Sequence, residues 1–362
     1  MKVMKFGGTS VGSPQRIKNV AEIITKDKGN FVVLSAMSGT TNSLVEICDY
    51  INRKNYEGVK ETISKMESLY RRHIDSLLSS EKYRKCALDY VLGVFSLIRN
   101  LSTQVFSQIQ EKIIVGQGEL ISTHLMFYYL QEQGVNVKLL AALDFMKTDP
   151  YGEPDQEYIK EKLNAILEAE SGASLYLTQG FICRNTHDEV DNLQRGGSDY
   201  SASLIGAAIG AEEIQIWTDI DGMHNNDPRV VEGTKAVRHL HFDEAAELAY
   251  FGAKILHPTC IQPAKFANIP VLLLNTMDPS APGTVINNVL DPGTIKAVAV
   301  KDSITAIRIK SSRMLLAHGF LRKVFEIFES YQTPIDMIST SEVSVSLSID
   351  KTTHLTGIIR DL

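Results

Sequence analysis

Short apolar runs that alternate with helical stretches constrain the fold of this 362-residue chain more than any other feature. Several runs are continuous in Val, Ile and Leu, which is typical of sheets covered on both faces. Such alternation predicts an α/β domain with a largely parallel sheet. The expected strands are 3–6, 31–36, 136–140, 174–182, 213–218 and 269–275, and the helices between them include 42–53, 119–132 and 199–209.

Two departures from the alternation divide the chain. Residues from about 56 to 112 show only helical periodicity, which predicts a helical insertion in a first domain of residues 1–290. The composition changes at Asp291-Pro292-Gly293, and residues 291–301 are expected to form a linker. Residues 302–362 follow the order strand, helix, strand, strand and the start of a helix, one strand short of a ferredoxin-like α+β domain. A second, incomplete domain is therefore expected.

Composition excludes several classes of function. The chain holds 37 Lys and Arg against 43 Asp and Glu, a formal net charge of −6, whereas general nucleic-acid binders are usually basic. No apolar run approaches the length of a membrane span, and the first strand begins too early for a signal peptide. The four cysteines form no C-x-x-C pair, so we expect reduced thiols in a cytoplasmic protein.

The first expected strand leads into a glycine turn, Lys5-Phe6-Gly7-Gly8-Thr9-Ser10, which precedes a helix. Glycine lets the backbone approach phosphate oxygens, and a helix N-terminus offers free N–H groups. A glycine turn without a ligand fits these residues equally well. No G-x-x-x-x-G-K-[ST] motif and no H-R-D or D-F-G motif occurs, so the chain is neither a P-loop protein nor a protein kinase.

A second glycine pair follows Arg195 and precedes Ser198 and Asp199 at an expected helix start. Ser198 and Asp199 suit helix capping, but capping does not explain Arg195, which can bind a carboxylate. Glu119 is expected in the first turn of a helix, where the dipole favours a carboxylate in any case. Lys254 by itself is equally typical of a surface lysine. Together, these glycine turns and cations within an acidic protein favour phosphoryl transfer.

The chain resembles the aspartokinases of the amino-acid-kinase superfamily over residues 3–275. Five segments in order carry this resemblance: Lys5-Phe6-Gly7-Gly8-Thr9-Ser10, Gly118-Glu119, Arg195-Gly196-Gly197-Ser198-Asp199, Trp217-Thr218-Asp219 and Gly252-Ala253-Lys254. Residues 314–349 resemble the ACT regulatory domain of that family. The segments 118–120 and 339–345 are most similar to its lysine-sensitive, single-function branch.

The resemblance implies transfer of the ATP γ-phosphoryl group to the side-chain carboxylate of L-aspartate, the first step of lysine, threonine and methionine biosynthesis. It implies Mg²⁺ bound mainly through the phosphates, with no metal site on the protein. The implied catalytic residues are Lys5, Glu119, Asp199 and Lys254. ATP would contact Lys5, Gly7, Gly8, Ser10, Thr218, Asp219, His224, Arg229 and Lys254. Aspartate would contact Ser35, Thr41, Glu119, Phe181, Arg195, Ser198 and Asp199.

The ACT resemblance implies a lysine effector site at a homodimer interface. The residues implied there are Met314, Ala317, His318, Phe320, Leu321, Asp336, Ser341, Glu342 and Val343. Core packing of an amphipathic helix is the alternative for Phe320 and Leu321. Three residues depart from the pattern of the relatives: His224 replaces a common tyrosine, Gln194 a frequent glycine, and Ala317 a serine of lysine-sensitive relatives.

Two other functions compete with aspartate kinase. A related kinase would act on glutamate or acetylglutamate, and Arg195 together with the ACT segment argues against it. A catalytically silent amino-acid sensor would have no need of the intact Lys5, Glu119, Asp199 and Lys254. The sequence is also compatible with a homoserine dehydrogenase module beyond residue 362, as in some members of the family.

Overall fold

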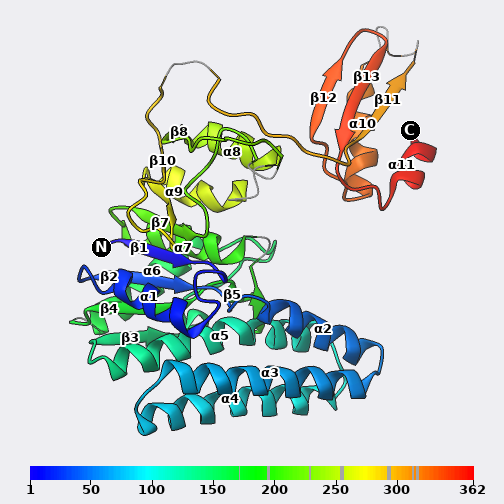
Figure 1. The fold of residues 1–362 in the computed structure, drawn as a ribbon. Coiled ribbons are helices and arrows are strands. Elements are labelled where there is room, and N and C mark those ends of the chain that lie inside the picture. Colours follow the sequence, from blue (N-terminus) through cyan, green and yellow to red (C-terminus); the bar gives the residue numbers. More distant parts are fainter. Residues whose placement is uncertain are drawn as a thin grey trace. The chain divides into compact units, whose positions relative to one another are not determined.

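The computed structural model describes residues 1–170, 172–193, 196–227, 230–252, 257–291, 295–311, 314 and 318–362. The chain folds into two compact units, Met1–Ala299 and Val300–Leu362 (Figure 1). Within the described ranges, no helix is both long and apolar enough to cross a membrane. All four cysteines are free, and Cys48, Cys183 and Cys260 are buried.

The first unit is built on a sheet whose described strands follow the order β3-β4-β2-β1-β7-β9-β10-β8. The strands are β1 (Val3–Phe6), β2 (Asn30–Leu34), β3 (Val137–Leu140), β4 (Leu175–Gln179), β7 (Ile214–Thr218), β8 (His239–His241), β9 (Val271–Asn275) and β10 (Thr284–Asn287). All neighbouring pairs are parallel except β9 with β10. The predicted parallel sheet is confirmed, and β1, β2 and β4 are buried at every position.

Alternate side chains of the strands enter two cores, one on each face of the sheet. Met4, Phe6 and Leu34 pack beneath five helices: α1 (Pro14–Ile24), α2 (Thr40–Asn52), α3 (Tyr56–Leu77), α4 (Glu81–Ser102) and α5 (Gln108–Glu132). Val3 and Val33 pack on the other face, beneath α6 (Gln156–Ala169), α7 (Gly197–Ile209), α8 (Phe242–Tyr250) and α9 (Gln262–Phe266). The described helices therefore cover both faces, with short 3-10 turns at Ala142–Asp144 and Pro258–Ile261.

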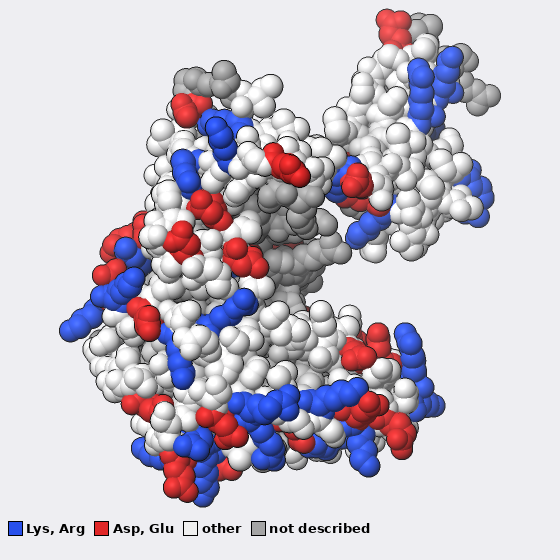
Figure 2. Space-filling view, in the orientation of Figure 1, with Lys and Arg blue, Asp and Glu red and all other residues white. Residues whose placement is uncertain are grey.

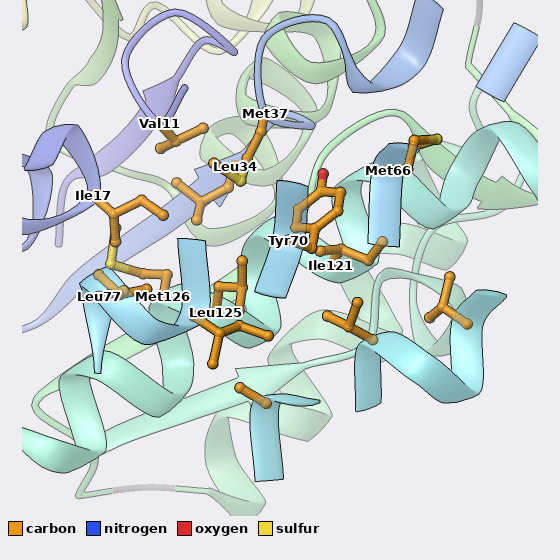
Figure 3. Packing of buried hydrophobic residues seen from close by; sticks show 14 of the residues in the cluster. Val11, Ile17, Leu34, Met37, Met66, Tyr70, Leu77, Ile121, Leu125 and Met126 are labelled. Atoms are coloured by element: carbon orange, nitrogen blue, oxygen red, sulfur yellow. The ribbon is translucent and has the colours of Figure 1, made fainter. Parts of the chain in front are cut away.

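The predicted helical insertion consists of α3, α4 and the start of α5. Tyr70 of α3 is fully buried, and its hydroxyl pairs with the Thr40 hydroxyl of α2 at 2.7 Å. Figure 3 shows Tyr70 in the same core as Val11 and Met37, which belong to loops after β1 and β2. The insertion thereby supports the loops at the carboxyl edge of the sheet. On the face seen in Figure 2, its basic and acidic side chains are interspersed.

Two predictions of local structure are wrong. Glu119 does not lie in the first turn of a helix, because α5 already begins at Gln108 with a capping box formed by Ser107 and Gln110. The expected strand 174–182 breaks after Gln179: Phe181 has a φ of 69°, and Ile182 opens β5 (Ile182–Arg184). That strand pairs with β6 (Val190–Asn192) in a separate antiparallel hairpin.

The second unit contains the antiparallel sheet β11-β13-β12, formed by Thr305–Lys310, Ser344–Ile349 and Met337–Thr340. Its helices are α10 (Phe320–Ser330) and α11 (Leu355–Asp361). This order of elements is the one predicted from the sequence. One face of the sheet packs on the helices, and the core consists of Ile307, Val324, Phe328, Val345, Leu347, Ile349 and Ile358.

Candidate active site

The candidate site lies at the carboxyl edge of the sheet, where four neighbouring parallel strands end together. Phe6 is paired with Leu34 on one side and Trp217 on the other, and Leu34 is paired with Gln179. The loops after β1, β2, β4 and β7 therefore leave the sheet at one level. In open α/β sheets this edge is where ligands bind.

An ion pair between Lys5 and Asp199 occupies the centre of this edge. Met4 and Phe6 point into the core beneath α1–α5, so Lys5 between them points to the opposite face, where α7 begins. Lys5 Nζ lies 2.7 Å from Asp199 Oδ1, and the two side chains are only 11% and 14% exposed. The pair holds a largely desolvated ammonium group beside the glycine turn, since a Cβ built on Gly7 would lie 3.6 Å from Lys5 Nζ.

The start of α7 is a close-packed junction. Its N-cap is Gly196, and no side chain caps it, so the capping interpretation of Ser198 and Asp199 is wrong. A Cβ added to Gly197 would lie 2.5 Å from Phe181 Cδ2. The Phe181 N–H donates to Ser201 Oγ at 3.0 Å, which fixes the loop after β4 to α7. Phe181 thus lies against the first turn of α7, which carries Ser198 and Asp199.

Glu119 enters the site from the middle of α5 and is 4% exposed. Its Oε1 accepts a hydrogen bond from the Ala36 N–H at 3.1 Å. Its Oε2 is buried and has no hydrogen-bond partner among the described residues. Burial raises the pKa of Glu119 to about 7, and the Ala36 N–H and the charge of Lys5 oppose this shift. A buried carboxylate with one open oxygen suits a cationic ligand.

The glycine turn approaches the loop after β2. The Ser38 N–H donates to Gly8 O at 3.1 Å, and a Cβ on Gly8 would lie 2.7 Å from Ala36 O. The Gly7 N–H donates to Trp217 O at 3.2 Å. The N–H groups of Gly8 and Thr9 donate to no described residue. Gly8 and Thr9, rather than Gly7, therefore offer donors to an anion; Thr9 was not predicted as a site residue, although it lies within the motif.

Ser10 differs from its predicted role as a phosphate ligand. Its side chain is fully buried, and its hydroxyl pairs with the Thr276 hydroxyl at 2.7 Å. No sequence signal marks Thr276, because the contact joins residues 266 positions apart. Ser35 follows β2, where its carbonyl accepts a hydrogen bond from Ser122 Oγ at 2.7 Å. Thr41 lies in the first turn of α2, which follows the same loop.

The predicted nucleotide side is more open. Thr218 ends β7, and its Oγ1 accepts the Ile220 N–H at 3.3 Å, while Asp219 is exposed. His224 lies further along this loop and pairs through Nδ1 with Thr234 Oγ1 at 2.9 Å. Beside it is an open cleft of about 380 Å³. Its lining residues are Asn225, Lys235, Ala236, Val237, Arg238, His239, Asp291 and Lys296.

Four predicted residues fall outside the described part of the chain: Arg195, Arg229, Lys254 and Ala317. The other residues predicted for the effector site lie in the second unit. Phe320 packs partly against the core, and Leu321 is 38% exposed. The Ser341 and Ser344 hydroxyls pair at 2.7 Å in the turn that also contains exposed Glu342 and Val343.

Asp336 lies apart from the rest of this set. It precedes β12, whereas Ser341 follows it. At about 3.3 Å per residue of extended chain, the backbones of Asp336 and Ser341 are roughly 16 Å apart. Ser311 donates its N–H to Val343 O, so Met314 and His318 follow a segment near the Ser341 end. Asp336 and Ser341 therefore lie at opposite ends of β12.

The chain matches known proteins over nearly its whole length. The family model described as amino acid kinase family matches residues 1–275. The lysine-sensitive aspartokinase 3 of Escherichia coli K12 is 35% identical, with 97% of this chain and 78% of that protein covered. The chloroplastic aspartokinase 3 of Arabidopsis thaliana is 36% identical, with 96% and 64% covered. The chain spans 63% to 66% of the three Arabidopsis aspartokinases.

Solved structures show the same relationship. E. coli aspartokinase III in complex with aspartate and ADP gives a TM-score of 0.86 at 33% identity, with 97% of this chain and 79% of that chain covered. The aspartate kinase of Clostridium acetobutylicum gives 0.81 at 26% identity, with 100% and 82% covered. Fold and site together define an amino acid kinase. Within that family, the chain belongs to the aspartokinases.

Proposed function

We propose that the protein transfers the γ-phosphoryl group of ATP to the side-chain carboxylate of L-aspartate, giving 4-phospho-L-aspartate. The observation that carries this proposal is Glu119 near the Lys5–Asp199 pair. Its buried Oε2 has no hydrogen-bond partner among the described residues and can accept a bond from a cation. An α-amino acid brings an ammonium group for Glu119, and its side-chain carboxylate is the acceptor. E. coli aspartokinase III, which shares this fold, has been solved with aspartate and ADP.

In this reaction a carboxylate oxygen of aspartate attacks the γ-phosphorus, and the bond from the γ-phosphorus to the oxygen bridging it to ADP breaks. No protein nucleophile is required. Lys5 stabilises the charge on the transferring phosphoryl group, and Asp199 holds Lys5 in place at 2.7 Å. Gly8 and Thr9 donate N–H groups to phosphate oxygens. By family resemblance, Arg195 binds the α-carboxylate of aspartate, and Lys254 and Arg229 contact the nucleotide.

The described residues fit a metal ion that arrives with the nucleotide. No three of their His, Cys, Asp or Glu side chains group into a metal site, and Asp199 already pairs with Lys5. We propose Mg²⁺ bound mainly through the ATP phosphates. There it would neutralise phosphate charge; the chain's own residues orient the reacting groups.

We further propose a catalytic domain of residues 1–290, a linker of 291–301 and an ACT regulatory domain of 302–362. The two compact units support this division, although they meet at Ala299 and Val300. The Val298 N–H donates to Asn225 O at 2.9 Å, so part of the linker packs on the first unit. Four free cysteines favour a reducing compartment such as the cytoplasm.

The proposed effector is lysine, bound between two copies of the second unit. A solved structure of E. coli aspartokinase III contains lysine and aspartate. The separation of Asp336 from Ser341 along β12 favours a site to which two copies contribute residues. A homodimer is therefore part of the proposal, and nucleic acid and membranes are not.

Trapping of the acyl phosphate with hydroxylamine tests the function directly. The purified chain is supplied with ATP, Mg²⁺ and L-aspartate, L-glutamate or N-acetyl-L-glutamate, each with and without lysine. We expect hydroxamate with aspartate and none with N-acetyl-L-glutamate, because N-acetylation removes the ammonium group that Glu119 recognises. Turnover with either other acid instead would assign a different substrate. Silence with all three would favour the sensor hypothesis.

A further inference from the structure

A buried pair of hydroxyl groups ties the first glycine turn to the end of a distant strand. Ser10 is 0% and Thr276 is 3% exposed, and their hydroxyl oxygens lie 2.7 Å apart. Ser10 belongs to the turn after β1, and Thr276 directly follows β9. The two residues are 266 positions apart in sequence. This contact therefore depends on the assembled sheet.

The Ser10 hydroxyl is enclosed by two partners. Besides the Thr276 hydroxyl, Ser10 Oγ lies 3.4 Å from Trp217 O, and either hydroxyl can be the donor in the pair with Thr276. Ser10 is left with no exposed surface for a phosphate group.

Backbone hydrogen bonds place both hydroxyls at the site. The Thr276 N–H donates to Thr218 O at 2.8 Å, and the Gly7 N–H donates to Trp217 O at 3.2 Å. Thr276 thus holds the end of β7 through its backbone and the glycine turn through its side chain. The end of β7 leads to the proposed nucleotide contacts Thr218 and Asp219. The glycine turn carries the free N–H groups of Gly8 and Thr9.

We propose that Thr276 is a positioning residue for phosphoryl transfer and acts through Ser10. It sets the position of the N–H groups of the turn, and of Lys5 beside them, relative to a nucleotide held after β7. This inference rests on the proposed function. Misplacement of reacting groups by about 1 Å can cost about 10²-fold in rate, so loss of one buried hydroxyl is expected to affect turnover beyond its effect on stability.

The test compares Thr276→Val, which keeps the side-chain shape, with Thr276→Ser, which keeps the hydroxyl. The matched control is Thr178→Val: Thr178 lies on β4 of the same sheet, is fully buried, and donates to Leu140 O at 2.9 Å. We expect T276V to lower kcat about tenfold, weaken ADP binding in calorimetry and leave the KM for aspartate unchanged. T276S should restore both values. T178V should lower only the melting temperature.

A double-mutant cycle identifies Ser10 as the intermediary. The double variant should lose no more in kcat and in ADP affinity than Ser10→Ala alone, because Ser10→Ala already removes the bond to Thr276 together with the contact to Trp217 O. If T276V does not fold, Ser10→Ala breaks the same bond from the other side. Losses that add, or a T276V enzyme with normal kcat and ADP affinity, overturn the inference. Wild-type protein without aspartate-dependent turnover contradicts the proposed function instead, and the double-mutant cycle on ADP affinity still tests the Ser10–Thr276 contact.

Discussion

The two glycine pairs of this chain look alike in sequence but do different work in the structure. Gly7-Gly8 and Gly196-Gly197 each precede a helix in a strand–turn–helix order, and each is flanked by a cation. The first pair leaves the N–H groups of Gly8 and Thr9 without described partners. The second pair is covered: a Cβ on Gly196 would lie 2.5 Å from Cys260 Sγ, and one on Gly197 would lie 2.5 Å from Phe181 Cδ2.

The difference shows that a glycine pair before a helix indicates that another group approaches the backbone closely. It does not indicate whether that group is a ligand or another part of the protein. At the first turn Gly8 is approached closely by Ala36 O, whereas a Cβ built on Gly7 would meet no heavy atom nearer than 3.6 Å. At the second turn the space is filled by protein, and the turn serves to place Asp199 against Lys5 at 2.7 Å. The Lys5–Asp199 pair joins the two turns. The position of the turn after β1 and the position of the turn before α7 therefore depend on each other.

Removing Lys5 should produce the largest effect, because this residue links both turns. For Lys5→Ala we expect turnover to fall by roughly 10²–10³, the scale of losing one transition-state charge stabiliser, with the fold retained. Lys2→Ala is the matched control: Lys2 directly precedes the same strand and pairs with Glu213 at 3.2 Å on the surface. Unchanged kcat in K5A, measured by hydroxamate formation, would remove Lys5 from the mechanism.

Much of this arrangement was predictable from the sequence. The parallel sheet and the helical insertion follow from patterns within short windows, and the family resemblance implied that Lys5 and Asp199 belong to one catalytic set. What failed was local: the start of α5 was hidden because the helical periodicity of the insertion continues into it. The break after Gln179 has one local signal, Gly180, but an isolated glycine inside a strand pattern also fits a bulge or a close backbone approach.

Contacts that depend on the order of strands in the assembled sheet were not predictable. Ser10 meets Thr276 because β1, β7 and β9 are neighbours, and no spacing in the sequence encodes that order. Likewise, the Ala36 N–H is a partner of Glu119 only because α5 crosses the loop after β2. The family resemblance implied that Ser10 contacts phosphate, whereas its side chain is buried in the interior.

The charge state of Glu119 tests the substrate side through pH. Its pKa is raised to about 7, so in the free protein the carboxylate is present mainly above that pH. A cationic amino group binds the carboxylate and not the neutral acid, so the KM for aspartate should fall as pH rises through about 7. Glu119→Gln should raise this KM about 10- to 100-fold, the scale of a hydrogen bond to a charged group, and abolish its pH dependence. A pH profile unchanged in E119Q would contradict the assignment.

Gly8→Ala tests the open turn. The added Cβ would lie 2.7 Å from Ala36 O, so the turn must move away from the loop after β2. We expect about a tenfold loss in kcat and weaker ADP binding, since the N–H groups of Gly8 and Thr9 move with it. The KM for aspartate should change less. Gly93→Ala in the middle of α4 meets no atom within 4 Å and should leave kcat unchanged while stabilising the helix by about 0.5–1 kcal/mol.

Gly197→Ala tests the packed turn, and its effect on catalysis should be the smallest of these. The new methyl group meets the ring, Cα and Cβ of Phe181, so we expect overpacking to destabilise the fold by about 1–3 kcal/mol in urea unfolding. Because Phe181 is a proposed aspartate contact, the KM for aspartate should rise a few-fold while ADP affinity stays normal. The reverse pattern, with ADP affinity lost and stability kept, would mean that the second turn also binds phosphate. The distinction drawn between the two glycine pairs would then be wrong.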